Sequence, residues 1–494
     1  MKEKRIVIRE GDRASFRNLT GCCVGTGRMD LALHREYQDE LRFVQDKCGF
    51  QYIRGHGLFS DGMGIYQEYP LPQGGKRAGY CFTYLDRVMD FYREAGLKPF
   101  LELGFMPGKL TDSPNKLFYW QAHTAPPRDM GAWCALVTAT LTHLKDRYGE
   151  DEVSSWPCEV WNEPNLPGFW ENADKQKYLE LYEATARAVK QVLPRMKVGG
   201  PAICGGEGSQ QWIADFLTFC RERDVPVDMV TRHAYMGQAP ERRERYTYHG
   251  MNAPEVLLDE MRASREIIDS FPEYKALPMI ITEFNTSYDP FCPIHDTPYN
   301  AALTASLLSK LGDVADGYSY WTFGDVFEEK GIPTRPFHGG FGLVAAGCIP
   351  KPTLWTFSFF AGLNGDAVYR DDGAVMTLRP DGAYEGVIWA PDRDGDVTVD
   401  LELPVSGSWT AFVETVDAES GDPARLWHLM GEPASLTPEQ TALLREAARP
   451  RVTALPLDHG HFRITLRPDA VARVRVMFAS GESDPGYDFD WYLR

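Results

Sequence analysis

Two glutamates follow short apolar runs, at positions from which both could act on one chemical bond. Glu163 comes at the end of the run Cys158–Trp161, and Glu283 at the end of the run Met279–Thr282. Carboxylates are rarely buried without a partner, so a buried strand that ends in a glutamate suggests a function. Two carboxyl groups that flank a glycosidic bond can cleave it, one protonated as the acid and the other ionised as nucleophile or base. The alternative is that each glutamate only pairs with an arginine, for which Arg54 is a candidate.

Eight apolar runs separated by helix-like stretches indicate the elements that position these glutamates. The runs are Leu19–Val24, Tyr52–Gly55, Pro99–Gly104, Cys158–Trp161, Val198–Pro201, Met229–His233, Met279–Thr282 and Tyr318–Thr322. Short continuous apolar runs are typical of strands buried on both faces. Within residues 14–350 they predict an α/β fold, a (β/α)8 TIM barrel, whose functional residues lie at the C-terminal ends of its strands. An open doubly wound sheet is the alternative, and the GxGxxG fingerprint that would favour it is absent.

After residue 350 the pattern changes to alternating apolar and polar residues separated by turn-rich segments. The alternating runs are Ala374–Leu378, Glu385–Trp389, Asp396–Leu401, Thr410–Glu414, His461–Leu466 and Ala472–Val476. This pattern predicts an antiparallel β-sandwich as an accessory domain over residues 351–494. A helical insert is expected at 438–449 with Thr437 as its N-cap. A strand within residues 1–13 is expected to fold back onto the sandwich.

Composition excludes several classes of function for the 494-residue chain. With 52 basic and 70 acidic residues the net charge is −18, so the chain lacks the basic surface of a nucleic-acid binder or of a protein that binds anionic membranes. It has no apolar run long enough to span a membrane and no signal-peptide pattern near its start. The ten cysteines form no CxxC and are expected to be free, which favours a cytoplasmic location. Without HExxH or HxxxH spacing, we expect no metal and no cofactor.

The stretches around both glutamates resemble the two signatures of glycoside hydrolase family 39, which contains β-xylosidases and α-L-iduronidase. They read Val160-Trp161-Asn162-Glu163-Pro164-Asn165 and Ile281-Thr282-Glu283-Phe284-Asn285-Thr286-Ser287-Tyr288. Four further stretches agree: Ile53–Asp61, Arg232–Tyr235, Tyr320–Glu329 and, as in the xylosidase branch, Trp427–Arg451. Two departures are Gly62, where that branch has an aspartate, and the loosely matching loop Asn115–Pro127. They bear on the identity of the sugar more than on the chemistry.

The resemblance implies a role for each residue of the site. Glu163 would be the general acid/base and Glu283 the nucleophile, held ionised by hydrogen bonds from Arg54 and Tyr235. Asn162 would hydrogen-bond the sugar 2-hydroxyl. The other implied sugar-pocket residues are His56 and His233, which contact the sugar or orient a carboxylate, Trp321 as the floor, Phe118 and Tyr288 as walls, and Glu328 and Glu329 as hydroxyl acceptors. The alternatives are structural histidines, a core tryptophan and a solvated loop for the two glutamates.

The predicted reaction is retaining exo-hydrolysis that releases β-D-xylose from the non-reducing end of xylo-oligosaccharides or of aryl and alkyl β-xylosides. Retention requires carboxyl groups about 5–5.5 Å apart. A uronate such as iduronate needs a cation in the pocket, whereas Glu328 and Glu329 would repel it, unless Arg335 reaches the sugar. Arabinosides, galactosides and glucosides are open alternatives, as is a non-catalytic carbohydrate-binding barrel. The resemblance also suggests a homo-oligomer, a dimer or a tetramer, that acts in carbohydrate metabolism.

Overall fold

Eight parallel strands close into a barrel in the computed structural model, which confirms the predicted fold class. They are β2 (Cys23–Arg28), β3 (Tyr52–His56), β6 (Lys98–Leu103), β9 (Cys158–Val160), β10 (Val198–Ile203), β11 (Met229–Tyr235), β14 (Met279–Asn285) and β15 (Gly317–Tyr320). The structure describes residues 2–391, 393–479 and 486–493, so parts of the predicted segments 1–13 and 351–494 lie outside the described residues.

The first barrel strand, β2, lies four residues later than the run Leu19–Val24 predicts. Its sequence contains Gly25 and Gly27, which favour a turn over a strand when the sequence is read alone. In the barrel a Cβ on Gly25 would lie 2.4 Å from the Trp321 ring, and a Cβ on Gly27 would lie 2.9 Å from the Phe327 ring. Both glycines therefore make room for aromatic rings, those of Trp321 and Phe327, which follow the last barrel strand β15.

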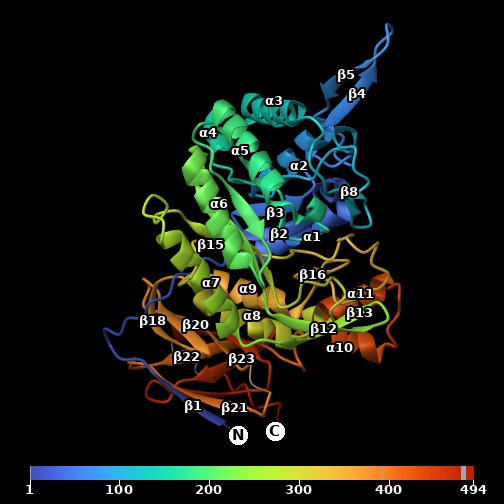
Figure 1. Ribbon diagram of the computed structural model, residues 1–494. Helices are drawn as coiled ribbons and strands as arrows, with labels where there is room; N and C mark the ends of the chain where they lie inside the picture. The colour runs from blue at the N-terminus through green and yellow to red at the C-terminus, as the bar shows by residue number, and fades with distance from the viewer. Residues whose placement is uncertain (1, 392, 480–485, 494) are drawn as a thin grey trace.

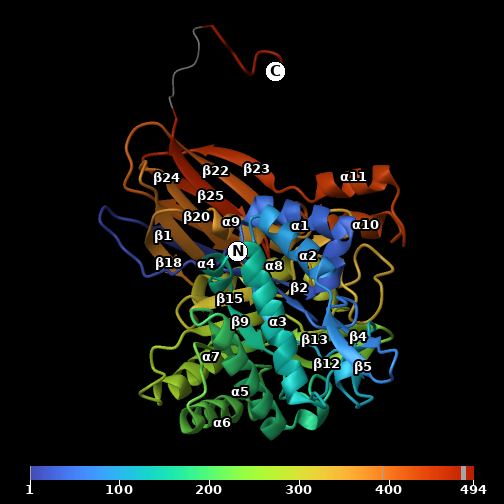
Figure 2. The ribbon, with the colours of Figure 1, turned by 90° about the horizontal axis from the view of Figure 1, so that it is seen from above.

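Helices on the outside of the barrel cover the strands (Figures 1 and 2). They are α1 (Arg35–Cys48), α2 (Thr83–Glu94), α3 (Met130–Tyr148), α4 (Glu150–Ser154), α5 (Lys175–Val192), α6 (Ser209–Arg223), α7 (Pro254–Asp269), α8 (Pro298–Leu311) and α9 (Pro352–Ala361). Helix α5 illustrates the local rules: the Asp174 side chain caps it by accepting from the Lys177 amide, and Tyr178, Leu181 and Tyr182 are buried on its inner face. No helix in the described ranges is long and apolar enough to cross a membrane.

Short hairpins and 3-10 turns extend the loops at the barrel ends. The hairpins are β4 (Tyr66–Pro70) with β5 (Lys76–Tyr80), β7 (Lys116–Leu117) with β8 (Ala122–His123), β12 (Gly237–Arg243) with β13 (Tyr246–Met251), and β16 (Val344–Ala345) with β17 (Ile349–Pro350). The 3-10 turns are η1 (Met29–Leu33), η2 (Gly108–Leu110), η3 (Glu171–Ala173) and η4 (Pro293–Asp296). The β4–β5 hairpin projects furthest from the barrel (Figure 1).

Two sheets form the C-terminal sandwich. One has the order β18-β19-β20-β25-β22-β23 and the other the order β1-β21-β24. Their strands are β1 (Lys2–Val7), β18 (Asp366–Asp371), β19 (Ala374–Leu378), β20 (Tyr384–Trp389), β21 (Val397–Glu402), β22 (Trp409–Val416), β23 (Arg451–Pro456), β24 (His461–Leu466) and β25 (Val471–Phe478). Ile6, Val399 and Val474 belong to the apolar core of this sandwich. Strand β1 lies beside β21, at the opposite end of the chain (Figure 1), and their pairing is parallel while the other pairs are antiparallel.

A small helical unit links the sandwich to the barrel. It contains α10 (Pro423–Leu429) and α11 (Pro438–Ala447), and α11 begins with a capping box formed by Thr437 and Gln440. Trp427 of α10 and Leu444 of α11 pack with Phe337 and Ile349 of the barrel's last loop. Helix α10 and strands β18 and β23 are not among the predicted elements, since their short sequences carry a weak periodic signal.

Candidate functional site

A pocket of about 590 Å³ opens at the C-terminal ends of the barrel strands, where a barrel of this type carries its functional residues. Eight of the twelve residues predicted for the site line it: His56, Asn162, Glu163, Tyr235, Glu283, Tyr288, Trp321 and Glu329. The other lining residues are Leu166, Phe169, Cys204, Gly205, Gly206, Gly237, Asn252 and Glu260. The predicted pair of glutamates therefore lies in one cavity.

Glu283, at the end of β14, is surrounded by hydrogen-bond donors. The Arg54 Nη1 atom donates to its Oε1 at 2.7 Å, and the Tyr235 hydroxyl donates to its Oε2 at 2.6 Å. Burial, together with the charge of Glu283, raises the pKa of Tyr235 well above its usual value, so the phenol keeps its proton as a donor. Only 4% of Glu283 is exposed. Charge-assisted hydrogen bonds of this kind favour the carboxylate form.

Glu163 follows β9 and has a different environment. Its Oε1 lies 2.8 Å from Nδ1 of His233, and its backbone amide donates to the Ala202 carbonyl at 2.9 Å. Burial raises the pKa of Glu163 to about 7, although the positive charges of His56 and Arg54 oppose the shift. Burial also lowers the pKa of His233 to about 3, so this imidazole is neutral at pH 7 and adds no positive charge next to Glu163.

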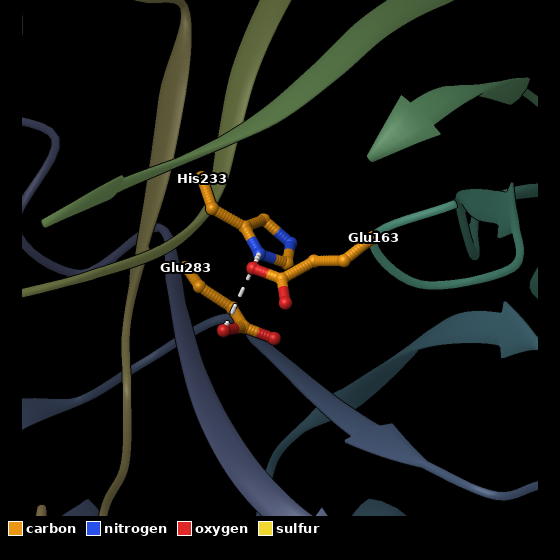
Figure 3. A group of neighbouring side chains, drawn as sticks. All are labelled: Glu163, His233 and Glu283. Carbon is orange, nitrogen blue, oxygen red and sulfur yellow. Dashed lines mark hydrogen bonds and ion pairs between the residues drawn. The ribbon is translucent and has the colours of Figure 1, made fainter. Parts of the chain in front are cut away.

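The two carboxylates approach each other across His233 (Figure 3). One oxygen of Glu163, one oxygen of Glu283 and one ring nitrogen of His233 all lie within 4.8 Å of one another. That spacing would also suit a metal ion. However, both oxygens of Glu283 already accept hydrogen bonds from Arg54 and Tyr235, and the Arg54 guanidinium would repel a cation at this position.

His56 and Trp321 lie together in another part of the pocket lining. Burial opposes protonation of His56, but its 2.6 Å contact with Glu102 and the charge of Glu102 raise its pKa. The Trp321 ring lies 4.6 Å from the His56 ring and only 2% of Trp321 is exposed. Burial raises the pKa of Glu329 to about 8, an effect that His56 opposes and the charges of Glu283 and Glu163 reinforce. Glu329 is therefore largely protonated at pH 7 and can donate as well as accept a hydrogen bond.

Four predicted residues do not line the pocket. Arg54 and His233 lie just beneath it, where they contact its carboxylates. Phe118 stacks on His56 with ring centroids 6.0 Å apart, so it supports the pocket from behind. Glu328 turns away, because its Oε2 accepts a hydrogen bond from Arg28 at 2.5 Å.

Comparisons with known proteins agree with this geometry. The family model for glycosyl hydrolases family 39 matches residues 5–459. The chain belongs to glycoside hydrolase family 39. It is 43% identical over 489 residues to a β-xylosidase from Geobacillus stearothermophilus, covering 97% of this chain and 94% of the relative. A β-xylosidase from Caldicellulosiruptor saccharolyticus is 32% identical, covering 90% of this chain and 92% of the relative.

A solved structure, described as a monomeric β-xylosidase from Caulobacter crescentus, superposes with a TM-score of 0.87 at 30% identity. It covers 97% of this chain and 100% of the relative. This family 39 chain is therefore a glycoside hydrolase, and its substrate is a carbohydrate.

Two buried glutamates beneath the pocket of this family 39 enzyme are absent from the sequence-based prediction. Glu102 of β6 and Glu159 of β9 are both fully buried, and both contact the Arg54 guanidinium. The same guanidinium donates from Nη2 to Asn162 at 2.8 Å. Arg54 thus fixes Asn162 and Glu283 while its own position is held from below. The sequence did contain a signal for both residues, because each is a glutamate inside an apolar run that was predicted to be a buried strand. A buried carboxylate requires a partner, so each could have been predicted to contact a buried cation.

Proposed function

We propose that this chain is a retaining exo-β-xylosidase. The observation that carries the proposal is the approach of the two carboxylates, with Glu163 and Glu283 oxygens within 4.8 Å across His233. Retaining enzymes keep their carboxyl groups about 5–5.5 Å apart, whereas inverting enzymes leave about 6.5–9.5 Å for a water molecule. The contrast between the two environments supports the assignment of roles, with a raised pKa at Glu163 and two donors at Glu283.

The reaction would proceed in two displacements. Glu283 attacks the anomeric carbon while Glu163 passes its proton to the departing oxygen, which leaves a covalent glycosyl-enzyme and an ionised Glu163. Glu163 then takes a proton from water, and that water displaces the sugar from Glu283. Asn162, held by Arg54, would accept a hydrogen bond from or donate one to the sugar 2-hydroxyl, an interaction that strengthens as the oxocarbenium ion develops.

The remaining roles follow from where each side chain lies. We place the sugar against Trp321, with His56 and Glu329 as its hydrogen-bonding partners, Tyr288 as a wall and Phe118 behind His56. His233 would orient both carboxylates. Glu328 would act indirectly, by fixing the loop through its pair with Arg28.

A neutral sugar fits the charges of the pocket better than a uronate does. No lysine or arginine is among the described residues that line it, so a sugar carboxylate would find no ammonium or guanidinium partner there. Arg335, the residue that could have reversed this expectation, donates to the Glu432 carbonyl at 2.9 Å and does not line the pocket. The names of the relatives from Geobacillus and Caldicellulosiruptor favour β-D-xylose among the neutral sugars.

A panel of 4-nitrophenyl glycosides tests the proposal directly. We expect kcat/KM to be highest for the β-D-xyloside, with the α-L-arabinoside, β-D-galactoside and β-D-glucoside lower and the uronides lowest. NMR of the first-formed product should show the β anomer. A preference for an aryl uronide would contradict the xylose assignment, and a first-formed α anomer would contradict retention.

The cellular setting and the assembly are further parts of the proposal. All ten cysteines are free, which is typical of a reducing compartment and supports a cytoplasmic location acting on short oligosaccharides. The dimer or tetramer expected for this chain stays a prediction. The Caulobacter relative, by contrast, is described as monomeric. Light scattering on the purified protein would measure the assembly.

A further inference from the structure

The barrel order divides the pocket into two sides. His56 ends β3, and Trp321 and Glu329 follow β15, so the sugar side is formed at the two strands that flank β2, and β15 lies across the barrel from β9. Glu163 follows β9, and the next strand in the barrel is β10, whose loop brings Cys204, Gly205 and Gly206 to the pocket. The acid must lie next to the oxygen that it protonates, so the β9–β10 side faces the leaving group.

Glu260 of α7 reaches into this leaving-group side. Its side chain is 31% exposed and lines the pocket, although α7 belongs to the outer layer of helices. A Cβ on Gly205 would lie 2.8 Å from the Glu260 Oε1 atom, so a glycine is needed where this carboxylate passes the loop. Gly205 belongs to the loop directly after β10, the strand next to β9, which places Glu260 on the side of the acid.

The contacts of Glu260 leave one carboxylate oxygen available. The fully buried Arg232 pairs with Oε1, and Oε1 also accepts from the Ser209 hydroxyl and the Gly206 amide, both at 3.4 Å. Within the described residues, every hydrogen bond to this carboxylate ends on Oε1. The Oε2 atom is thus held in place with no donor among the described residues, and Asn252 lines the same pocket.

We propose that Glu260 is a specificity residue for the leaving group, whose Oε2 accepts a hydrogen bond from a sugar hydroxyl. The enzyme would then favour a sugar leaving group over one without hydroxyls. This inference rests on the proposed role of Glu163 as the acid, because that role defines the leaving-group side. Arg232 prepares the acceptor before substrate binds, so little side-chain freedom is lost when the bond forms.

The decisive measurement compares two substrates with the same sugar. For Glu260→Gln, we expect kcat/KM on β-1,4-xylobiose to fall about 10- to 100-fold, the range for a hydrogen bond to a charged acceptor, while kcat/KM on 4-nitrophenyl β-D-xyloside stays within about twofold. Glu260→Asp keeps the charge that neutralises Arg232 but withdraws the carboxylate, so it should show the same selective loss. Asp259→Asn, an exposed carboxylate on the same helix, is the matched control and should change neither value.

A second measurement uses the reverse of the leaving step. Added xylose should intercept the glycosyl-enzyme through the same site, so Glu260→Gln should lower transfer to xylose relative to water while transfer to methanol is unchanged. Equal losses on both substrates in both variants, or no loss on xylobiose, would overturn the role of Glu260. If the wild type cleaved neither xyloside, the proposed function itself would fail, which is a distinct outcome.

Discussion

The surroundings of the two glutamates differ more than their sequence positions suggest. Both residues end barrel strands and both are nearly buried, with 7% of Glu163 and 4% of Glu283 exposed. Glu283 accepts hydrogen bonds from the Arg54 guanidinium and the Tyr235 phenol, while the hydrogen-bond partner of the Glu163 carboxylate is a neutral imidazole. Similar burial is therefore combined with two strong donors at Glu283 and with a raised pKa at Glu163.

The two carboxylates therefore differ in their donors rather than in their depth, and the proposed roles rest on that difference. Burial alone disfavours charge on any carboxylate. Arg54 offsets that cost for Glu283 because it is itself anchored by Glu102 and Glu159, so a cation is retained at a fully buried position. Three experiments test the contrast between the two sides.

The largest effect is expected from removing each carboxylate. Glu283→Ala should lower kcat/KM on 4-nitrophenyl β-D-xyloside by at least about 10⁴-fold, since the covalent intermediate cannot form. Azide should restore part of the turnover by filling the vacated space, which would yield the α-xylosyl azide. In Glu163→Ala, azide should instead attack the covalent intermediate and yield the β-xylosyl azide. NMR of the products decides, and exchanged anomers would mean that the two roles are exchanged.

A smaller effect is expected from removing one donor on the Glu283 side. Tyr235→Phe deletes a hydrogen bond to a carboxylate, worth about 1.5–3 kcal/mol, which corresponds to a fall in kcat/KM of about 10- to 100-fold. Tyr288→Phe is the matched control, because the Tyr288 hydroxyl bonds to no described residue and its ring would stay. We expect that variant to stay within about threefold of wild type. Similar losses in both variants would contradict a specific role for the Tyr235 donor.

The smallest effect concerns the proton on Glu163. Because its pKa is raised to about 7, Glu163 is protonated below pH 7 and loses its proton above it. The pH profile of kcat/KM should therefore fall above about pH 7, approaching tenfold per pH unit. Glu163→Gln, measured with an activated dinitrophenyl xyloside, should abolish this limb.

Glu329→Gln is the control for the pH profile, since the pKa of Glu329 is also raised, to about 8. The limb near pH 7 should persist in this variant. If the limb disappeared in Glu329→Gln but persisted in Glu163→Gln, the titrating group would be Glu329, and the prediction for Glu163 would be wrong.

The apolar runs predicted the barrel because a strand that is buried on both faces consists of a continuous run of apolar residues. All eight runs correspond to barrel strands, and the glutamates at two of their ends lie in one pocket. The glycine-rich strand β2 was misplaced, since Gly25 is explained only by the Trp321 ring above it. Likewise, adjacent Glu328 and Glu329 look equivalent in sequence, and Arg28, 300 residues earlier, turns one of them away from the pocket.

Local periodicity and short contiguous motifs were enough to predict the fold class, the family and the two glutamates. The resemblance already implied that Arg54 and Tyr235 donate to Glu283. The tertiary structure added the groups that the motifs do not specify: Glu102 and Glu159 beneath Arg54, Arg28 against Glu328, and Arg232 behind Glu260. A pKa depends on burial and on charges within a few ångströms, and the barrel brings these charges together from strands far apart in the chain. For that reason the sequence predicted the two glutamates and their roles, while the buried charges that surround them could be identified only in the folded barrel.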